Sequence, residues 1–142
     1  MILLDTCVVS EALKPDPSEA VLYWIESLAE DRVYLSALVI GELQKGVTLL
    51  EPGTKRSLLE LWLEQLTHRF QGRILPFDQD CALVWGRMVA VLEQQGQKVP
   101  LMDSLIGAQA LKYQALLATR NVRDYQYLGV NVINPWDFGS TS

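Results

Sequence analysis

The chain has 142 residues and a mass of 16.0 kDa, enough for one domain and too little for a second complete core. A hydrophobic share of 49% excludes a mainly disordered chain, and no apolar stretch approaches the roughly 20 residues that span a bilayer. The formal net charge of −5 disfavours a protein whose main task is non-specific gripping of phosphate backbones.

The first residues and the two cysteines indicate the compartment. Residues 1–4 lead directly into Asp5 without a basic segment, a pattern that does not fit a secretory signal. Cys7 and Cys81 form no CxxC pair, so zinc is poorly supported and we expect both thiols to be reduced. We therefore expect a cytoplasmic protein that does not associate with membranes.

Short apolar strands alternate with amphipathic helices along the chain. Strands are predicted over residues 2–4, 33–35, 73–77, 115–119 and 131–133, and helices over 18–30, 37–50, 55–70, the segment capped by Asp78, and 102–113. This alternation predicts an α/β fold with helices on both faces of an open, mainly parallel sheet. We assign residues 1–138 to this domain and residues 139–142 to a mobile tail.

One of the predicted helices carries a well-marked apolar stripe. In the helix 55–70, five large apolar side chains recur at helical spacing: Leu58, Leu59, Trp62, Leu63 and Leu66. We expect all five to face inward.

Two acidic residues in the first third of the chain are candidates for the functional site. Asp5 follows the first predicted strand, and such positions face the crevice beyond the strand ends of a parallel sheet. Asp5 could equally cap a helix that begins after it. Glu42 flanks the apolar stripe of the helix 37–50, and taken alone it indicates a boundary acid that reaches water.

Asp103 is the most informative single position. It lies in the first turn of the helix 102–113, on the same face as Ile106, Gly107 and Ala110. An inward carboxylate needs compensation from the helix N-terminus or from a cation, unless it is only a first-turn or capping acid. We expect the small residues Gly107 and Ala110 to let this helix approach the sheet, which would bring Asp103 near Asp5.

Polar residues also follow the predicted strand 115–119, and they include Asn121 and Asp124. On local grounds they indicate a capped turn that opens a short helix. Together with Asp5, Glu42 and Asp103, however, they can converge on one point. Oxygen ligands without histidine suit Mg²⁺ or Mn²⁺ rather than zinc.

Five segments, in this order and spacing, resemble PIN-domain ribonucleases, particularly the VapC and FitB-like toxins. They are residues 2–11; Tyr34-Leu35-Ser36 with Gly41-Glu42-Leu43 and Gly46-Val47; residues 74–78; residues 103–110; and Thr119-Arg120-Asn121 with residues 132–136. The resemblance implies a three-layer α/β/α sandwich around a mainly parallel sheet of about five strands. It also implies an endoribonuclease that uses Mg²⁺ or Mn²⁺, often the toxin of a toxin–antitoxin pair. The implied partners are RNA, a cognate antitoxin and a second copy of the chain.

The resemblance further implies which residues form the site. Asp5, Glu42 and Asp103 would hold the metal, with support from the Thr6 hydroxyl. Many relatives carry a fourth acid where this chain has Asn121, and Asp124 comes three residues later. We expect Asp124 to supply that charge as a fourth catalytic acid, while Asn121 hydrogen-bonds a carboxylate or a water.

Arg120 and Arg123 are placed to steer or clamp a phosphate, although solvated loop charges are an equally good interpretation.

Two other functions remain open on the sequence. A receiver-type phosphoryl-transfer domain also gathers acids at strand ends. A lysine at the end of a late strand would favour a receiver domain, but this chain has Thr119-Arg120 there. A PIN-like module that binds protein or nucleic acid without cleaving it would share the whole pattern. Metal-dependent cutting of RNA separates these possibilities.

Overall fold

In the computed structural model, which describes residues 1–139, five parallel strands form one sheet in the order β3-β2-β1-β4-β5. The strands are β1 (Ile2–Leu4), β2 (Val33–Ser36), β3 (Ile74–Leu75), β4 (Leu116–Ala118) and β5 (Val132–Ile133). Central β1 pairs in register with β2 on one side and β4 on the other. The predicted parallel sheet of about five strands is confirmed. Of the expected mobile tail, residues 140–142 lie outside the described residues.

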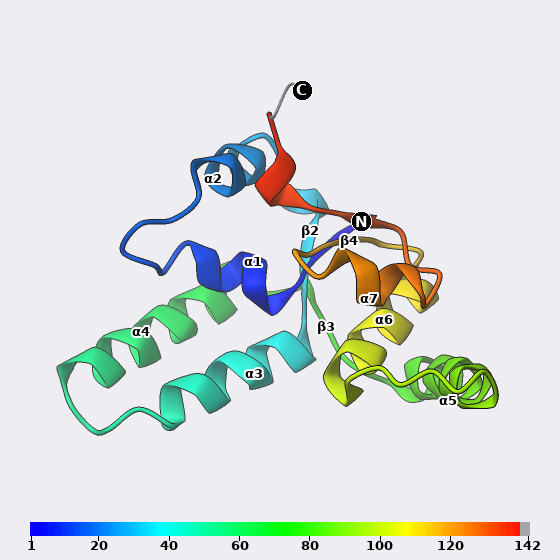
Figure 1. Cartoon of the computed structure of the whole chain (residues 1–142). Coiled ribbons are helices and arrows are strands. Elements are labelled where there is room, and N and C mark those ends of the chain that lie inside the picture. Colours follow the sequence, from blue (N-terminus) through cyan, green and yellow to red (C-terminus); the bar gives the residue numbers. More distant parts are fainter. Residues whose placement is uncertain (140–142) are drawn as a thin grey trace.

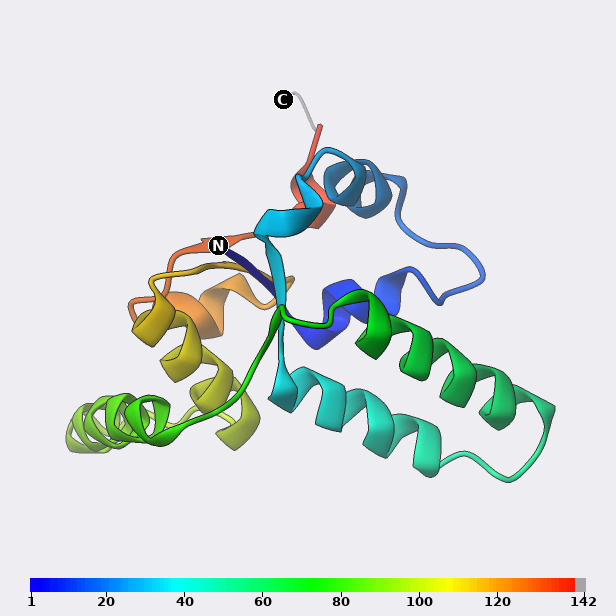
Figure 2. The ribbon, with the colours of Figure 1, turned by 180° about the vertical axis from the view of Figure 1, so that it is seen from behind.

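Helices cover both faces of this sheet (Figures 1 and 2). On one side lie α1 (Thr6–Glu11), α3 (Ala37–Thr48) and α4 (Thr54–Arg69), and on the other α5 (Gln79–Gln94), α6 (Leu101–Tyr113) and α7 (Val122–Gln126). α2 (Glu19–Glu26) contacts the short helix η2 (Pro135–Asp137), and η1 (Glu30–Arg32) precedes β2. The predicted three-layer sandwich is thus confirmed. Over residues 1–139, no helix combines the length and the apolar character needed to cross a membrane.

The sheet is built from runs that are apolar on both faces. Leu3, Leu35 and Leu117 are fully buried in the three central strands, as expected for parallel strands covered on both sides. The helices that follow the strands begin at side-chain caps. The Ser36 hydroxyl accepts from the Leu38 N–H at 3.0 Å to start α3, and Asp78 Oδ1 accepts from the Cys81 N–H at 3.0 Å to start α5.

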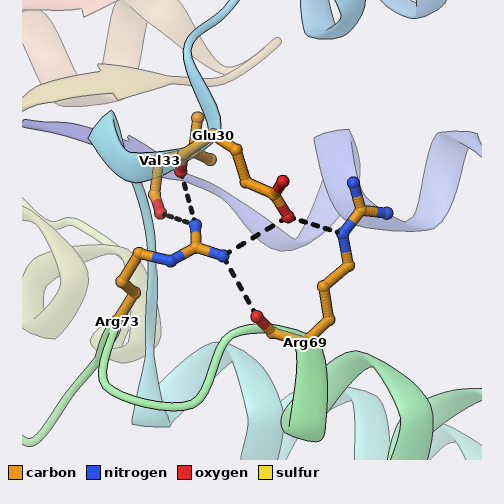
Figure 3. A network of polar contacts seen from close by, with 4 residues as sticks. All are labelled: Glu30, Val33, Arg69 and Arg73. Carbon is orange, nitrogen blue, oxygen red and sulfur yellow. Dashed lines mark hydrogen bonds and ion pairs between the residues drawn. The ribbon is translucent and has the colours of Figure 1, made fainter.

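The edge strand β3 is fastened to the start of β2 by Arg73 (Figure 3). Its Nη1 donates to the carbonyl oxygens of Glu30 and Val33, both at 2.6 Å. Glu30 Oε1 in turn accepts from Arg69 Nε at 3.0 Å. These contacts hold together the amino-terminal ends of β2 and β3. The acidic residues lie at the opposite, carboxyl-terminal ends of the strands.

α3 and α4 pack against each other and extend beyond the sheet as an arm (Figure 1). Leu63 of α4 is buried, as predicted, and Trp62 and Leu66 are half-buried. The prediction for Leu58 is wrong, because its exposed fraction is 62%. Helical spacing identifies an apolar face but does not tell whether the chain has anything to cover it.

The strand order determines where the crevice lies. From β1 the chain builds outward to β2 and β3, then returns to add β4 and β5 on the other side of β1. The carboxyl ends of β1 and β4 therefore flank the topological switch point, where α/β sheets bind ligands. The observed order also differs from the 2-1-3-4-5 order of receiver domains, which excludes the receiver-type interpretation.

Candidate active site

Asp5 stands at the switch point, directly after β1, and both of its carboxylate oxygens are engaged. Oδ1 accepts from the Thr6 N–H at 2.8 Å and so caps α1. Oδ2 accepts from the Thr119 hydroxyl at 2.8 Å, directly after β4. Asp5 is only 8% exposed. Both interpretations of Asp5 are therefore correct, since the same residue caps α1 and lies at the switch point.

Glu42 is linked to Asp5 by Thr6, the residue that follows Asp5 in the chain. The Thr6 hydroxyl donates to Glu42 Oε1 at 2.7 Å, joining α1 to α3. The Glu42 side chain is half-buried. Glu42 is thus held in a specific contact 36 positions along the chain from its partner rather than simply reaching into water.

Asp103 is held by α7. Its Oδ2 accepts from Asn121 Nδ2 at 3.0 Å, and its Oδ1 accepts from the Tyr125 hydroxyl at 3.4 Å. The N-cap of α6 is Pro100, so Asp103 is a first-turn acid and not the cap. As expected from the sequence, the Asn121 side chain contacts a carboxylate.

The fully buried Thr119 connects the two halves of the site. Its hydroxyl donates to Asp5 and accepts from the Asn121 N–H at 3.0 Å. An unbroken set of hydrogen bonds therefore leads from Glu42 to Asp103. We call its members the carboxylate network: Asp5, Thr6, Glu42, Asp103, Thr119, Asn121 and Tyr125.

The carboxylates of the network repel one another. Burial raises the pKa of Asp5, and the hydrogen bond from Thr119 offsets part of that rise. Burial also raises the pKa of Asp103, and the negative charges of Asp5 and Asp124 raise it further, with a smaller contribution from Glu42. Four acids from distant parts of the chain thus concentrate negative charge at the carboxyl ends of the central strands.

The donor set fits a hard divalent cation, because it consists of carboxylates whose mutual repulsion such an ion would relieve. Among the described residues, no group of three or more Asp, Glu, His or Cys side chains is arranged closely enough to hold a metal ion. The carboxylate oxygens of Asp5, Glu42 and Asp103 instead accept hydrogen bonds from the hydroxyl and N–H donors of the carboxylate network. The chemistry of the donors therefore fits a hard divalent cation, although the described side chains do not form a ready-made metal site.

Asp124 and Arg120 flank the network. Asp124 is half-buried in α7, and its charge acts on Asp103. The exposed Arg120 guanidinium lies over the ring of Trp136, with Cζ 4.9 Å from the ring centroid. The predicted contact of Arg120 and Arg123 with a substrate phosphate stays a prediction.

Thr119 and Tyr125 are the two network members that sequence reasoning did not single out. Thr119 could have been found by the same signal as Asp5, since it directly follows a buried strand. Tyr125 lies in α7, four residues after its N-cap residue Asn121. Cys7 also lies near Asp5 Oδ2, at 3.9 Å, but burial raises the pKa of its thiol.

Gly107 has a different role from the one expected. A Cβ added there would come within 2.6 Å of Leu128 Cδ1 and 3.6 Å of the Tyr125 ring. The small residue therefore lets α6 approach α7 and the turn after it, rather than the sheet. The approach places Asp103 against the residues that hold it.

Comparison with known proteins identifies the family. The PIN domain model matches residues 2–127. The chain is 41% identical to "Toxin FitB" of Neisseria gonorrhoeae and 34% identical to "VapC ribonuclease Y4jK" of Sinorhizobium fredii, each time over 96% of this chain and 99% of the relative. The solved structure "FitAB bound to IR36 DNA fragment" superposes with a TM-score of 0.92 at 38% identity, covering 100% of both chains. As its opening Asp-Thr segment and the four later segments suggested, this chain belongs to the PIN-domain family.

Proposed function

We propose that this protein is a divalent-metal-dependent endoribonuclease and the toxin of a toxin–antitoxin pair. The observation that carries the proposal is the concentration of Asp5, Glu42, Asp103 and Asp124 at the switch point, where burial raises the pKa of Asp103 and the neighbouring negative charges raise it further. A site that brings acids together against their repulsion suits a ligand with positive charge. The relatives named as a toxin and as a ribonuclease support the same conclusion.

In this proposal Asp5, Glu42 and Asp103 hold Mg²⁺ or Mn²⁺, and Asp124 adds negative charge. When bound, such an ion supplies Lewis-acid stabilisation of the charge that develops on a cleaved phosphodiester. The residues of the chain do the orienting. Thr119 and Thr6 fix the carboxylates of Asp5 and Glu42 through their hydroxyls.

Substrate binding requires a second feature, because the chain as a whole is acidic. A bound cation neutralises the carboxylates that would otherwise repel a phosphate. Arg120 and Arg123, exposed after β4, extend the positive charge at the edge of the site. RNA affinity should therefore depend on the divalent cation.

Two protein partners belong to the proposal. The first is a cognate antitoxin, supported by the relative called a toxin and by the similar structure of FitAB on DNA. The second is another copy of the chain. Large apolar side chains stand exposed on α4 (Leu58 and Leu61) and on α5 (Leu83), and burial of such side chains is a common driving force for association. Light scattering at micromolar concentration should give the mass of a dimer, and a monodisperse monomer would contradict it.

The experiment that tests the proposed activity is cleavage of single-stranded RNA by the purified chain, with Mg²⁺, with Mn²⁺ and with a chelator. Cleavage that needs either ion and stops on chelation is the expected result. RNA binding without cleavage at saturating metal would instead favour the non-cleaving module, for which Asn121 at the fourth acidic position is the specific argument.

A further inference from the structure

Tyr125 is the least expected member of the carboxylate network. Its side chain is fully buried, and its ring lies beside Gly107 of α6. Its hydroxyl reaches Asp103 Oδ1 at 3.4 Å. A buried hydroxyl costs free energy unless it is hydrogen-bonded. A phenylalanine would fill the same space without that cost, so the contact with Asp103 is what distinguishes Tyr from Phe at this position.

The hydroxyl acts together with Asn121. Asn121 is the N-cap residue of α7, and Tyr125 lies within the helix four positions later. Asn121 Nδ2 donates to one oxygen of Asp103, and the Tyr125 hydroxyl donates to the other. Two donors on the two oxygens fix the rotation of the carboxylate as well as its position. A single donor would leave the carboxylate free to turn about its Cβ–Cγ bond.

The Tyr125 ring reaches Asp103 past Gly107. Gly107 lies one turn after Asp103 on α6, and the Tyr125 Cδ1 atom is 3.6 Å from the position of a Cβ at Gly107. The ring thus passes along α6 from Gly107 toward Asp103. The ring therefore packs in ordinary van der Waals contact beside Gly107, on the path from α7 to the acid.

We propose that Tyr125 is a positioning residue, whose hydroxyl orients the Asp103 carboxylate for a divalent cation shared with Asp5. The inference rests on the proposed metal-dependent function. Residues that hydrogen-bond a metal-ligating side chain and orient it typically contribute about 10–100-fold to metal affinity. The hydrogen bond from Tyr125 also lowers the pKa of Asp5, in agreement with a hydroxyl that faces both acids.

The test compares Tyr125→Phe with Tyr127→Phe. Tyr127 is in the same segment, and 60% of it is exposed, so its hydroxyl is removed without a change in the network. Phe keeps the ring that packs beside Gly107, and the unfolding temperature without metal verifies that each variant is folded. Mn²⁺ affinity is then measured by calorimetry, together with the rise in unfolding temperature that saturating Mn²⁺ produces. Wild type and Asp103→Asn are measured beside them.

We expect Tyr125→Phe to weaken Mn²⁺ binding by about tenfold or more and to reduce the Mn²⁺-induced rise in unfolding temperature. Tyr127→Phe should match wild type in both. A Tyr125→Phe protein that loses stability without metal but binds Mn²⁺ as wild type does would overturn the inference, because its hydroxyl would then be purely structural. The proposed function would survive that result, since Asp103→Asn would still lose Mn²⁺. If wild type and Asp103→Asn bind Mn²⁺ equally, both the function and the inference fail.

Discussion

The Thr119 hydroxyl donates to Asp5 Oδ2 at 2.8 Å, across 114 positions of the chain. This bond joins the carboxyl ends of β4 and β1, the two strands that flank the switch point. It is also the link through which Asn121, and with it Asp103, is connected to Asp5. The positions of two acids thus depend on one buried hydroxyl.

Replacing Thr119 by Val should destabilise the protein by about 1–3 kcal/mol, because Asp5 would lose its donor while staying buried. The pKa of Asp5 should rise further, since the Thr119 hydrogen bond lowers it. Urea unfolding at neutral pH measures the change. The matched control is Thr67→Val on the exposed side of α4, where the hydroxyl donates to the Leu63 carbonyl oxygen. Equal losses at the two positions would argue against a special role for Thr119.

Asp103→Asn should raise the unfolding temperature of the metal-free protein at neutral pH. Burial and the charges of Asp5 and Asp124 raise the pKa of Asp103 in the folded state. The folded protein therefore holds this proton to higher pH than the unfolded chain. Its stability falls as pH rises from the usual value of 3.8 through the raised pKa. The advantage of the variant should accordingly vanish in acid.

Thermal unfolding of wild type and Asp103→Asn across this pH range, in the presence of a chelator, measures the effect. Asp16→Asn, in the exposed loop after α1, is the control for loss of one negative charge. If Asp103→Asn instead loses several degrees and keeps its metal affinity, Asp103 is only a first-turn acid that stabilises α6.

The two candidates for the fourth position should differ in their effect on Mg²⁺. Asn121→Ala removes one donor to Asp103 and should weaken Mg²⁺ binding by about 10–100-fold. Asp124→Asn removes a negative charge that acts on Asp103 and should weaken it more. Titration of activity against Mg²⁺ compares them, with exposed Asn131→Ala as control. If Asp124→Asn leaves the Mg²⁺ dependence unchanged and Asn121→Ala weakens it, then Asn121 and not Asp124 completes the acidic site.

Gly107→Ala should destabilise the protein by about 1–3 kcal/mol, because the added methyl overpacks a buried contact with Leu128. Gly41→Ala is the matched control. It lies within α3 with nothing near the added Cβ, and alanine there should stabilise the helix by up to about 1 kcal/mol. Denaturant unfolding gives both values. An increase in stability at both positions would show that the Leu128 side chain can move aside without loss.

The parts of the site that could be predicted are those with a local signal. Asp5 ends an apolar strand, and Asp103 stands in the first turn of a helix on its inward face. Thr119 follows a strand as Asp5 does, but which acid it would contact has no local signal, and Tyr125 has none at all. Nothing near Thr119 or Tyr125 in the sequence specifies that a hydroxyl will meet a carboxylate from another element, because each contact exists only once the sheet has closed.

The same limit applies to the fold. Strand and helix order followed from hydrophobic periodicity, and the strand positions agree to within two residues. The six-residue α1 is too short for a periodic pattern, and only the capping ability of Asp5 pointed to it. Leu58 was misplaced because the α3–α4 arm extends past the sheet, a feature of tertiary structure that a helical stripe does not report.

If the acids at the switch point hold the metal that supports RNA cleavage, Asp5→Asn should abolish cleavage. Asparagine is as good an N-cap as aspartate, so α1 and the fold should be kept. The rate of RNA cleavage is measured for wild type and Asp5→Asn across a Mg²⁺ titration, with unfolding temperatures as the check on folding. We predict Mg²⁺-dependent cleavage by wild type and none above background by the folded variant. A folded Asp5→Asn protein with near-wild-type, Mg²⁺-dependent activity would show that Asp5 does not hold the metal.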